Sequence, residues 1–167
     1  PAQANKIVLW NKLGSEHEVL NSEIGPDGRF IGSAFHYEPG QFGNGFVRQS
    51  TDSEVVFDLP TDAGLAAHGT MEAWIVPKVS NPVPFEYGIF CLICIKGDTP
   101  ATGGVNLWWG DGVTGLGFEG FFFHDGGYAD TGREAHQFVA VPGIPIHAAI
   151  TWDVEGIGET SDTLRVY

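Results

Sequence analysis

Apolar and polar residues alternate with a period of two in two stretches of the chain. In residues 69–77 one set of alternate positions is apolar, namely Met71, Ala73 and Ile75. The positions between them hold Thr70, Glu72 and Trp74. In residues 146–153 the alternating sets are Ile146, Ala148, Ile150 and Trp152 against His147, Ala149, Thr151 and Asp153. Such alternation is typical of strands with one buried face, so each stretch predicts a strand.

Other short apolar runs predict further strands. Residues 7–13 predict the first strand. In residues 53–60 apolar and polar residues alternate, which predicts another strand. Residues 87–96 are apolar at successive positions, as expected of a central strand covered on both sides. Residues 105–109 and 118–123 flank a glycine-rich segment that begins with Gly110-Asp-Gly112, which predicts a hairpin with its turn there.

The 24 glycines and 10 prolines lie between these runs, which indicates many short strands joined by turns. No long stretch has helical periodicity, and residues 13–24 are expected to form a loop with one helical turn. We therefore predict one all-β domain over residues 1–167. Its expected architecture is an antiparallel two-sheet β-sandwich, or jelly roll. Trp10, Trp74 and Trp152 are expected in its core.

Cys91 and Cys94 lie three residues apart in the strand expected at residues 87–96. Residues three apart in a regular strand point to opposite faces. We therefore predict no disulfide between them, and two reduced thiols that act as small apolar residues. With no second cysteine pair, a zinc ribbon is excluded.

Charge limits the classes of partner. The chain has 8 Lys and Arg against 21 Asp and Glu, a formal net charge of −13. Phosphate binding needs a cationic surface, so neither nucleic acid nor an anionic membrane is an expected partner. No apolar run approaches the ~18 residues of a membrane span. No signal peptide is visible and Pro1 is not an initiator, so the chain is expected to begin after processing or at an artificial start.

Three segments together resemble a known family. They are Gln41-Phe-Gly-Asn-Gly-Phe-Val47, Gly69-Thr-Met-Glu-Ala-Trp-Ile-Val-Pro77 and Ile146-His-Ala-Ala-Ile-Thr-Trp-Asp153. In this order they resemble the concanavalin A-like lectin/glucanase superfamily, in its laminin-G-like branch. That branch typically shows Gly-x-Phe-Gly-x-Gly/Ala, Thr-x-Glu-x-Trp-x-x-Pro and His-x-Ala-x-Thr-Trp/Tyr-Asp. The resemblance covers roughly residues 40–167 and marks a fold more than a reaction.

The resemblance implies two further features. In laminin-G-like domains a segment like residues 163–167 is usually followed by Val-Asp-Gly and more strands, which this sequence lacks. The fold is then permuted or trimmed, the sequence is partial, or another chain supplies a strand. Many such domains also hold one calcium ion near an N-terminal loop. Calcium takes carboxylate and carbonyl oxygens, so the resemblance favours Glu23 and Asp27 as ligands.

Catalytic motifs are sparse. Glycosidases usually need two carboxylates at a defined separation, and the Glu-x-Asp-x-x-Glu strand of laminarinase-type members is missing here. Glu72 stands alone, and Asp125 enters an Asp-Gly-Gly turn. No Gly-x-Ser-x-Gly elbow, phosphate loop or His-Glu-x-x-His motif occurs. The sequence favours a protein that is not an enzyme.

The expected hairpin offers a candidate sugar-binding surface. Sugar recognition needs a flat aromatic face for the ring and polar groups for the hydroxyls. If Leu107 faces inward, Trp108 faces outward and serves as the platform for the sugar ring. Asp111, in the expected turn, would then accept a hydrogen bond from a sugar hydroxyl. Further candidates across the hairpin are Phe121, His124, Asp125 and Tyr128. The alternative is that these aromatic residues line the interior.

These observations favour a non-catalytic carbohydrate-binding, lectin-like module of an extracellular or cell-surface protein, with a glycan as partner. The first alternative is a structural or adhesive β-sandwich subunit of a surface layer or filament, which self-associates or has its sheet completed by another chain. The second alternative is a small glycan-active enzyme.

Overall fold

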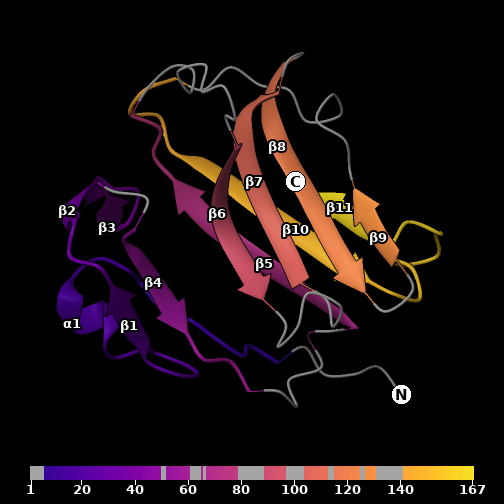
Figure 1. Ribbon diagram of the computed structural model, residues 1–167, viewed down its shortest axis with the longest axis horizontal. Coiled ribbons are helices and arrows are strands. Elements are labelled where there is room, and N and C mark those ends of the chain that lie inside the picture. The colour runs from indigo at the N-terminus through magenta and orange to yellow at the C-terminus, as the bar shows by residue number, and fades with distance from the viewer. Residues whose placement is uncertain are drawn as a thin grey trace. The chain divides into compact units, whose positions relative to one another are not determined.

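The computed structural model is built almost entirely of antiparallel strands, as the sequence predicts (Figure 1). It describes residues 6–49, 52–60, 65, 67–78, 89–96, 104–112, 115–124, 127–130 and 141–167. In β6, β8, β9 and most of β7 the description covers the backbone alone. The chain groups into two compact units, Pro1–Ala63 and Gly64–Tyr167.

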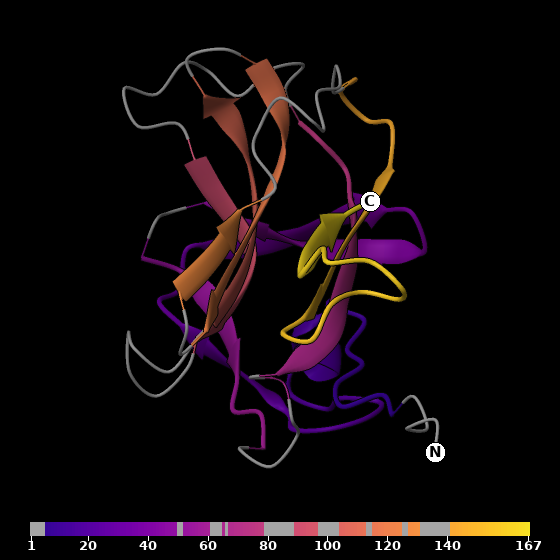
Figure 2. The same ribbon diagram turned by 90° about the vertical axis from the view of Figure 1, so that its right-hand side faces the viewer.

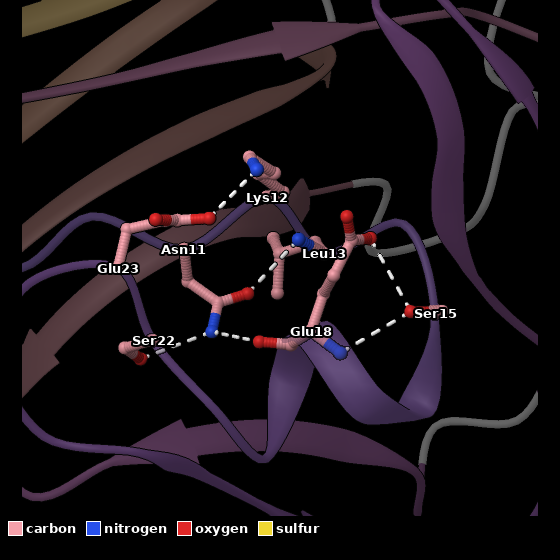
Figure 3. A network of polar contacts seen from close by, with 7 residues as sticks. All are labelled: Asn11, Lys12, Leu13, Ser15, Glu18, Ser22 and Glu23. Carbon is pink, nitrogen blue, oxygen red and sulfur yellow. Dashed lines mark hydrogen bonds and ion pairs between the residues drawn. The ribbon is translucent and has the colours of Figure 1, made fainter.

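The first unit begins with the one helix in the described part of the chain, α1 (Glu16–Val19). Ser15 caps it, because its Oγ accepts the Glu18 N–H at 3.2 Å. Asn11 Nδ2 donates to the Glu18 carbonyl at 2.7 Å, and thereby satisfies a carbonyl at the helix end (Figure 3). Val19 is fully buried. The single helical turn expected within residues 13–24 is thus confirmed.

The first unit also contains two antiparallel pairs of strands. β1 (Gly28–Ile31) pairs with β4 (Glu54–Phe57), and β2 (Phe35–Gly40) pairs with β3 (Gly43–Arg48). Their aromatic side chains form one cluster, made of Phe30, Phe35, Tyr37 and Phe46. The Phe30 and Phe35 rings stack with centroids 4.4 Å apart, a geometry that aromatic pairs favour.

The second unit contains two antiparallel sheets. The first has the order β11-β10-β5, with β5 (His68–Ile75), β10 (Ile146–Asp153) and β11 (Leu164–Val166). The second has the order β6-β7-β8-β9, with β6 (Ile89–Lys96), β7 (Gly104–Gly112), β8 (Gly115–His124) and β9 (Gly127–Asp130). The expected hairpin of β7 and β8 is confirmed, with longer strands than predicted.

Both sheets contribute to the core of the second unit, and they lie on either side of it (Figure 2). The buried residues of this core are Met71, Val105, Leu107, Ala148, Ile150, Trp152, Leu164 and Val166. The inward positions predicted for β5 and β10 are therefore confirmed. Trp152 is 1% exposed, and its indole Nε1 donates to the Leu65 carbonyl at 2.8 Å, so its one polar atom is satisfied.

Three sequence-based expectations are wrong. Trp10 and Trp74 are 53% and 48% exposed and do not lie in the core. Trp74 is exposed because β5 places it on the polar side of the strand. Residues 7–13 do not form a strand; Trp10 makes only an isolated antiparallel bridge with Ile24.

The facing predicted for Cys91 and Cys94 is also wrong. Cys91 pairs with Trp108 and Cys94 with Asn106, although these partners are only two residues apart on β7. The register shifts between Cys91 and Ile93, because a bulge inserts an extra residue into β6. By register the two cysteines therefore occupy the same face of the sheet. The absence of a disulfide stays a prediction.

Gly69 gives a test of this core. A Cβ atom at Gly69 would lie 2.5 Å from Cζ2 of the Trp152 ring, and that ring is buried and held by its hydrogen bond to Leu65. Gly69→Ala is therefore expected to lower the free energy of unfolding by about 1–3 kcal/mol, as overpacking does. Chemical denaturation measures it. Gly45→Ala is the control, because a Cβ there meets nothing within 4 Å. Equal stability of Gly69→Ala and the parent would contradict this packing.

Candidate functional site

The outer face of β5 and β10 presents a mixed aromatic and polar surface. The two strands pair over eight positions each, from His68 opposite Asp153 to Ile75 opposite Ile146. Because side chains alternate along a strand, the faces turned away from the core share one surface. On β5 the exposed side chains of this surface are His68, Thr70, Glu72 and Trp74. On β10 the positions opposite them are Asp153, Thr151, Ala149 and His147.

Trp74, His147 and Glu72 form a cluster of contacting side chains towards one end of this surface. Trp74 and His147 are direct cross-strand partners, and their ring centroids lie 5.1 Å apart with the planes tilted by 38°. His147 Nε2 lies 3.4 Å from Glu72 Oε2, which is an ion pair only when the imidazole is protonated. The imidazole therefore contacts both other side chains and helps to orient them. Trp74 remains half-exposed, at 48%.

Further polar side chains lie along the same face of β5 and β10. Thr70 and Thr151 are paired, with their hydroxyl oxygens 3.0 Å apart. Hydroxyls both donate and accept hydrogen bonds. Between them and the Trp74–His147 pair lies Ala149, opposite Glu72. Ala149 is only 8% exposed, so it contributes little to the exposed part of this surface.

The neighbouring strand β11 adds the positive charge of Arg165, which is paired with the carboxylate of Asp162. Arg165 pairs with Thr151, and its Nη2 donates to Asp162 Oδ2 at 2.9 Å and to Thr160 Oγ1 at 2.7 Å. The hydrogen bond to Asp162 is the main cause that raises the pKa of Arg165. Because Asp162 neutralises this guanidinium, Arg165 does not offset the carboxylate of Glu72.

The two carboxylates of this face do not form a glycosidase pair. Asp153 lies opposite His68, which is four residues along β5 from Glu72. Four residues of strand span roughly 14 Å. Catalytic carboxyl groups of glycosidases lie about 5–5.5 Å apart in retaining enzymes and about 6.5–9.5 Å apart in inverting ones. The geometry of this face therefore suits binding rather than glycoside cleavage by this pair.

The register of the second sheet places the residues predicted from the hairpin on two different faces. Trp108 pairs with Glu119, Phe121 with Asn106, and Tyr128 with Phe123. By register these three aromatic positions share the face opposite to that of the core residues Val105 and Leu107.

Asp111 and His124 fall on the other face by register, opposite Leu116 and Gly127. The turn expected at residues 110–112 is wrong, because β7 continues through Gly112. The strand therefore separates Asp111 from Trp108 instead of bringing them together. Asp125 lies outside the described residues.

The calcium ligands predicted near the N-terminus have other partners. Glu23 Oε1 lies 2.6 Å from Lys12 Nζ (Figure 3). Asp27 Oδ1 accepts the Ser22 N–H at 2.8 Å. In the described part of the chain no three or more His, Cys, Asp and Glu side chains group so as to hold a metal ion. This arrangement does not fit calcium without displacement of Lys12, and calcium binding stays a prediction.

Comparison with known proteins gives no relative. No family model, no curated protein and no solved structure matches the chain. Within the described ranges, no helix has the length and apolar character needed to cross a membrane.

Sequence reasoning missed the Trp74 surface as a site, although the signal was present. The alternation in residues 69–77 had already assigned Trp74 to the side of Thr70 and Glu72. The cross-strand partner His147 was not available from either segment alone, because it depends on the pairing register.

The Lys12–Glu23 pair predicts a titration behaviour. The hydrogen bond from Lys12, and then its charge, lower the pKa of Glu23 below its ordinary value of 4.5. Because the folded-state pKa is depressed, the pair stabilises the fold above about pH 4.5, and this contribution is lost as the pH falls through the folded pKa. Lys12→Met is expected to raise the pKa of Glu23, as measured by NMR titration of its carboxyl group.

The same titration tests calcium. If the ion binds Glu23 and Asp27, adding calcium shifts both carboxyl resonances and raises the melting temperature by mass action. Lys12→Met should then bind calcium more tightly than the parent.

The ion pair between Lys12 and Glu23 has its own contradicting outcome. An identical Glu23 titration in the parent and in Lys12→Met would contradict it.

Proposed function

We propose that this protein is a non-catalytic carbohydrate-binding, lectin-like module of an extracellular or cell-surface protein. The proposal includes a two-sheet β-sandwich of the concanavalin A-like, laminin-G-like type. The antiparallel sheets around one core in the second unit support this architecture. The three sequence segments that resemble the family include β5 and β10, which carry the candidate surface.

The observation that carries the proposal is the half-exposed Trp74 beside His147 and Glu72. An exposed indole on a soluble domain provides a flat apolar face for the C–H surface of a pyranose. The carboxylate of Glu72 and the hydroxyls of Thr70 and Thr151 provide acceptors and donors for sugar hydroxyls. Stacking and hydrogen bonding thus come from one surface.

A second surface competes for the same function. The outer face of β7, β8 and β9 holds the positions of Trp108, Phe121 and Tyr128 by register. We place the primary site on β5 and β10, because there the exposure of the indole and its polar neighbours are defined. The two surfaces lie on different sheets, so single substitutions separate them.

Trp74→Ala is expected to weaken retention on an immobilised glycan several-fold. Loss of one stacked indole removes on the order of 1 kcal/mol, which corresponds to a factor of about five in affinity. The melting temperature should stay close to that of the parent, because Trp74 lies outside the core. A glycan array identifies the retained sugars, and affinity electrophoresis then compares the variants.

Trp10→Ala is the matched control, since it also removes a half-exposed indole but lies in the first unit. It should be retained like the parent. If Trp108→Ala loses retention and Trp74→Ala does not, the site is on the second sheet. If the parent binds no glycan, the proposed function fails and the structural-subunit alternative takes its place.

A further inference from the structure

The candidate surface is elongated along the strands. Thr70 and Thr151 lie opposite each other, four residues along each strand from Trp74 and His147. Four residues of strand cover roughly 14 Å, which is longer than a single pyranose ring. A terminal sugar on Trp74 would not reach the threonine pair. A chain of several sugars lying along β5 and β10 would contact both ends of the surface.

The charge of the surface is negative at its centre. The Glu72 carboxylate is 67% exposed and lies between the two ends, next to the aromatic pair. Asp153 adds a second carboxylate at the far end, opposite His68. The cation on β11, Arg165, is engaged by Asp162. The protein as a whole carries a formal charge of −13, so the surrounding field reinforces this sign.

A carboxylate in this place affects neutral and anionic ligands differently. Its oxygens accept hydrogen bonds from sugar hydroxyls, and such charge-assisted bonds are stronger than neutral ones. The same oxygens repel a uronate or a sulfate held on Trp74. Like charges placed together are a common means of rejecting a wrong partner.

From these observations we infer that the surface binds an internal stretch of an uncharged polysaccharide along β5 and β10, and that Glu72 excludes anionic chains. This inference rests on the proposed glycan-binding function. Trp74 supplies affinity for any pyranose, and Glu72 determines which chains are accepted.

The test measures binding of two matched ligands by isothermal titration calorimetry. One is a neutral gluco-oligosaccharide, and the other is the same oligosaccharide oxidised to carry C6 carboxylates. Measurements at pH 8 lie above the range in which an imidazole ordinarily gains its proton. The parent should bind the neutral oligomer and bind the oxidised one at least threefold more weakly. Affinity for the neutral ligand should rise from one sugar to about three, the length that spans the surface.

Glu72→Gln keeps the shape and an acceptor oxygen but removes the charge. It should tighten binding of the oxidised oligomer about threefold at low salt. It should weaken binding of the neutral oligomer, because a neutral amide oxygen replaces the charge-assisted acceptor. The gain should shrink in high salt, which screens the repulsion. Glu159→Gln is the control: it makes the same change in an exposed residue of the loop between β10 and β11. It should leave the ratio of the two affinities as in the parent.

The outcomes distinguish failure of this inference from failure of the proposed glycan-binding function. If the parent binds both ligands equally, or Glu72→Gln leaves their ratio unchanged, the exclusion by Glu72 is overturned while glycan binding stands. If one sugar binds as tightly as three, the extended-chain inference is overturned. If neither the neutral nor the oxidised ligand binds, and the glycan array is also empty, the proposed function fails together with the inference.

Discussion

The antiparallel register of β5 with β10 is the constraint on which the second unit depends. Eight positions of each strand pair, and because side chains alternate, this one register defines two surfaces. One surface closes the core with Ile150 and Trp152, which are nearly inaccessible to solvent. The other surface carries Trp74 beside His147. A slip of one residue would expose Trp152 and bury His147, so the stability of the core also maintains the candidate site.

The sequence predicts the faces of these strands well, because a period of two is a local property that needs no knowledge of the partner. The prediction that Trp74 lies in the core is wrong, because two criteria conflict there. Its apolar ring favoured burial, whereas its position in the alternation favoured exposure, and the strand geometry prevails. Trp152 obeys both criteria and is buried. An aromatic residue at a polar position of an alternating strand is therefore a signal for an exposed aromatic side chain.

Other features could not be read from single segments, because they are properties of pairing. The bulge in β6 shifts the register between Cys91 and Ile93, and so changes the facing of Cys94. Likewise, β7 continues through Gly112 because β8 pairs with it there, which moves Asp111 away from Trp108. Gly110 and Gly112 mark their segment as permissive of a turn, but glycine does not decide whether the partner strand continues.

The division of roles within the candidate site follows from the physics of its members. The stacking that we propose on Trp74 depends on shape and dispersion, so it would change little with salt and would accept many sugars. Repulsion at Glu72 depends on charge, acts over about a Debye length, and discriminates between ligands of equal shape. His147 lies between the two, 3.4 Å from the Glu72 carboxylate and 5.1 Å from the Trp74 ring, centroid to centroid. In the function that we propose, affinity would therefore come mainly from Trp74 and selectivity from Glu72, so substitution of Glu72 would alter the selectivity while stacking on Trp74 remains.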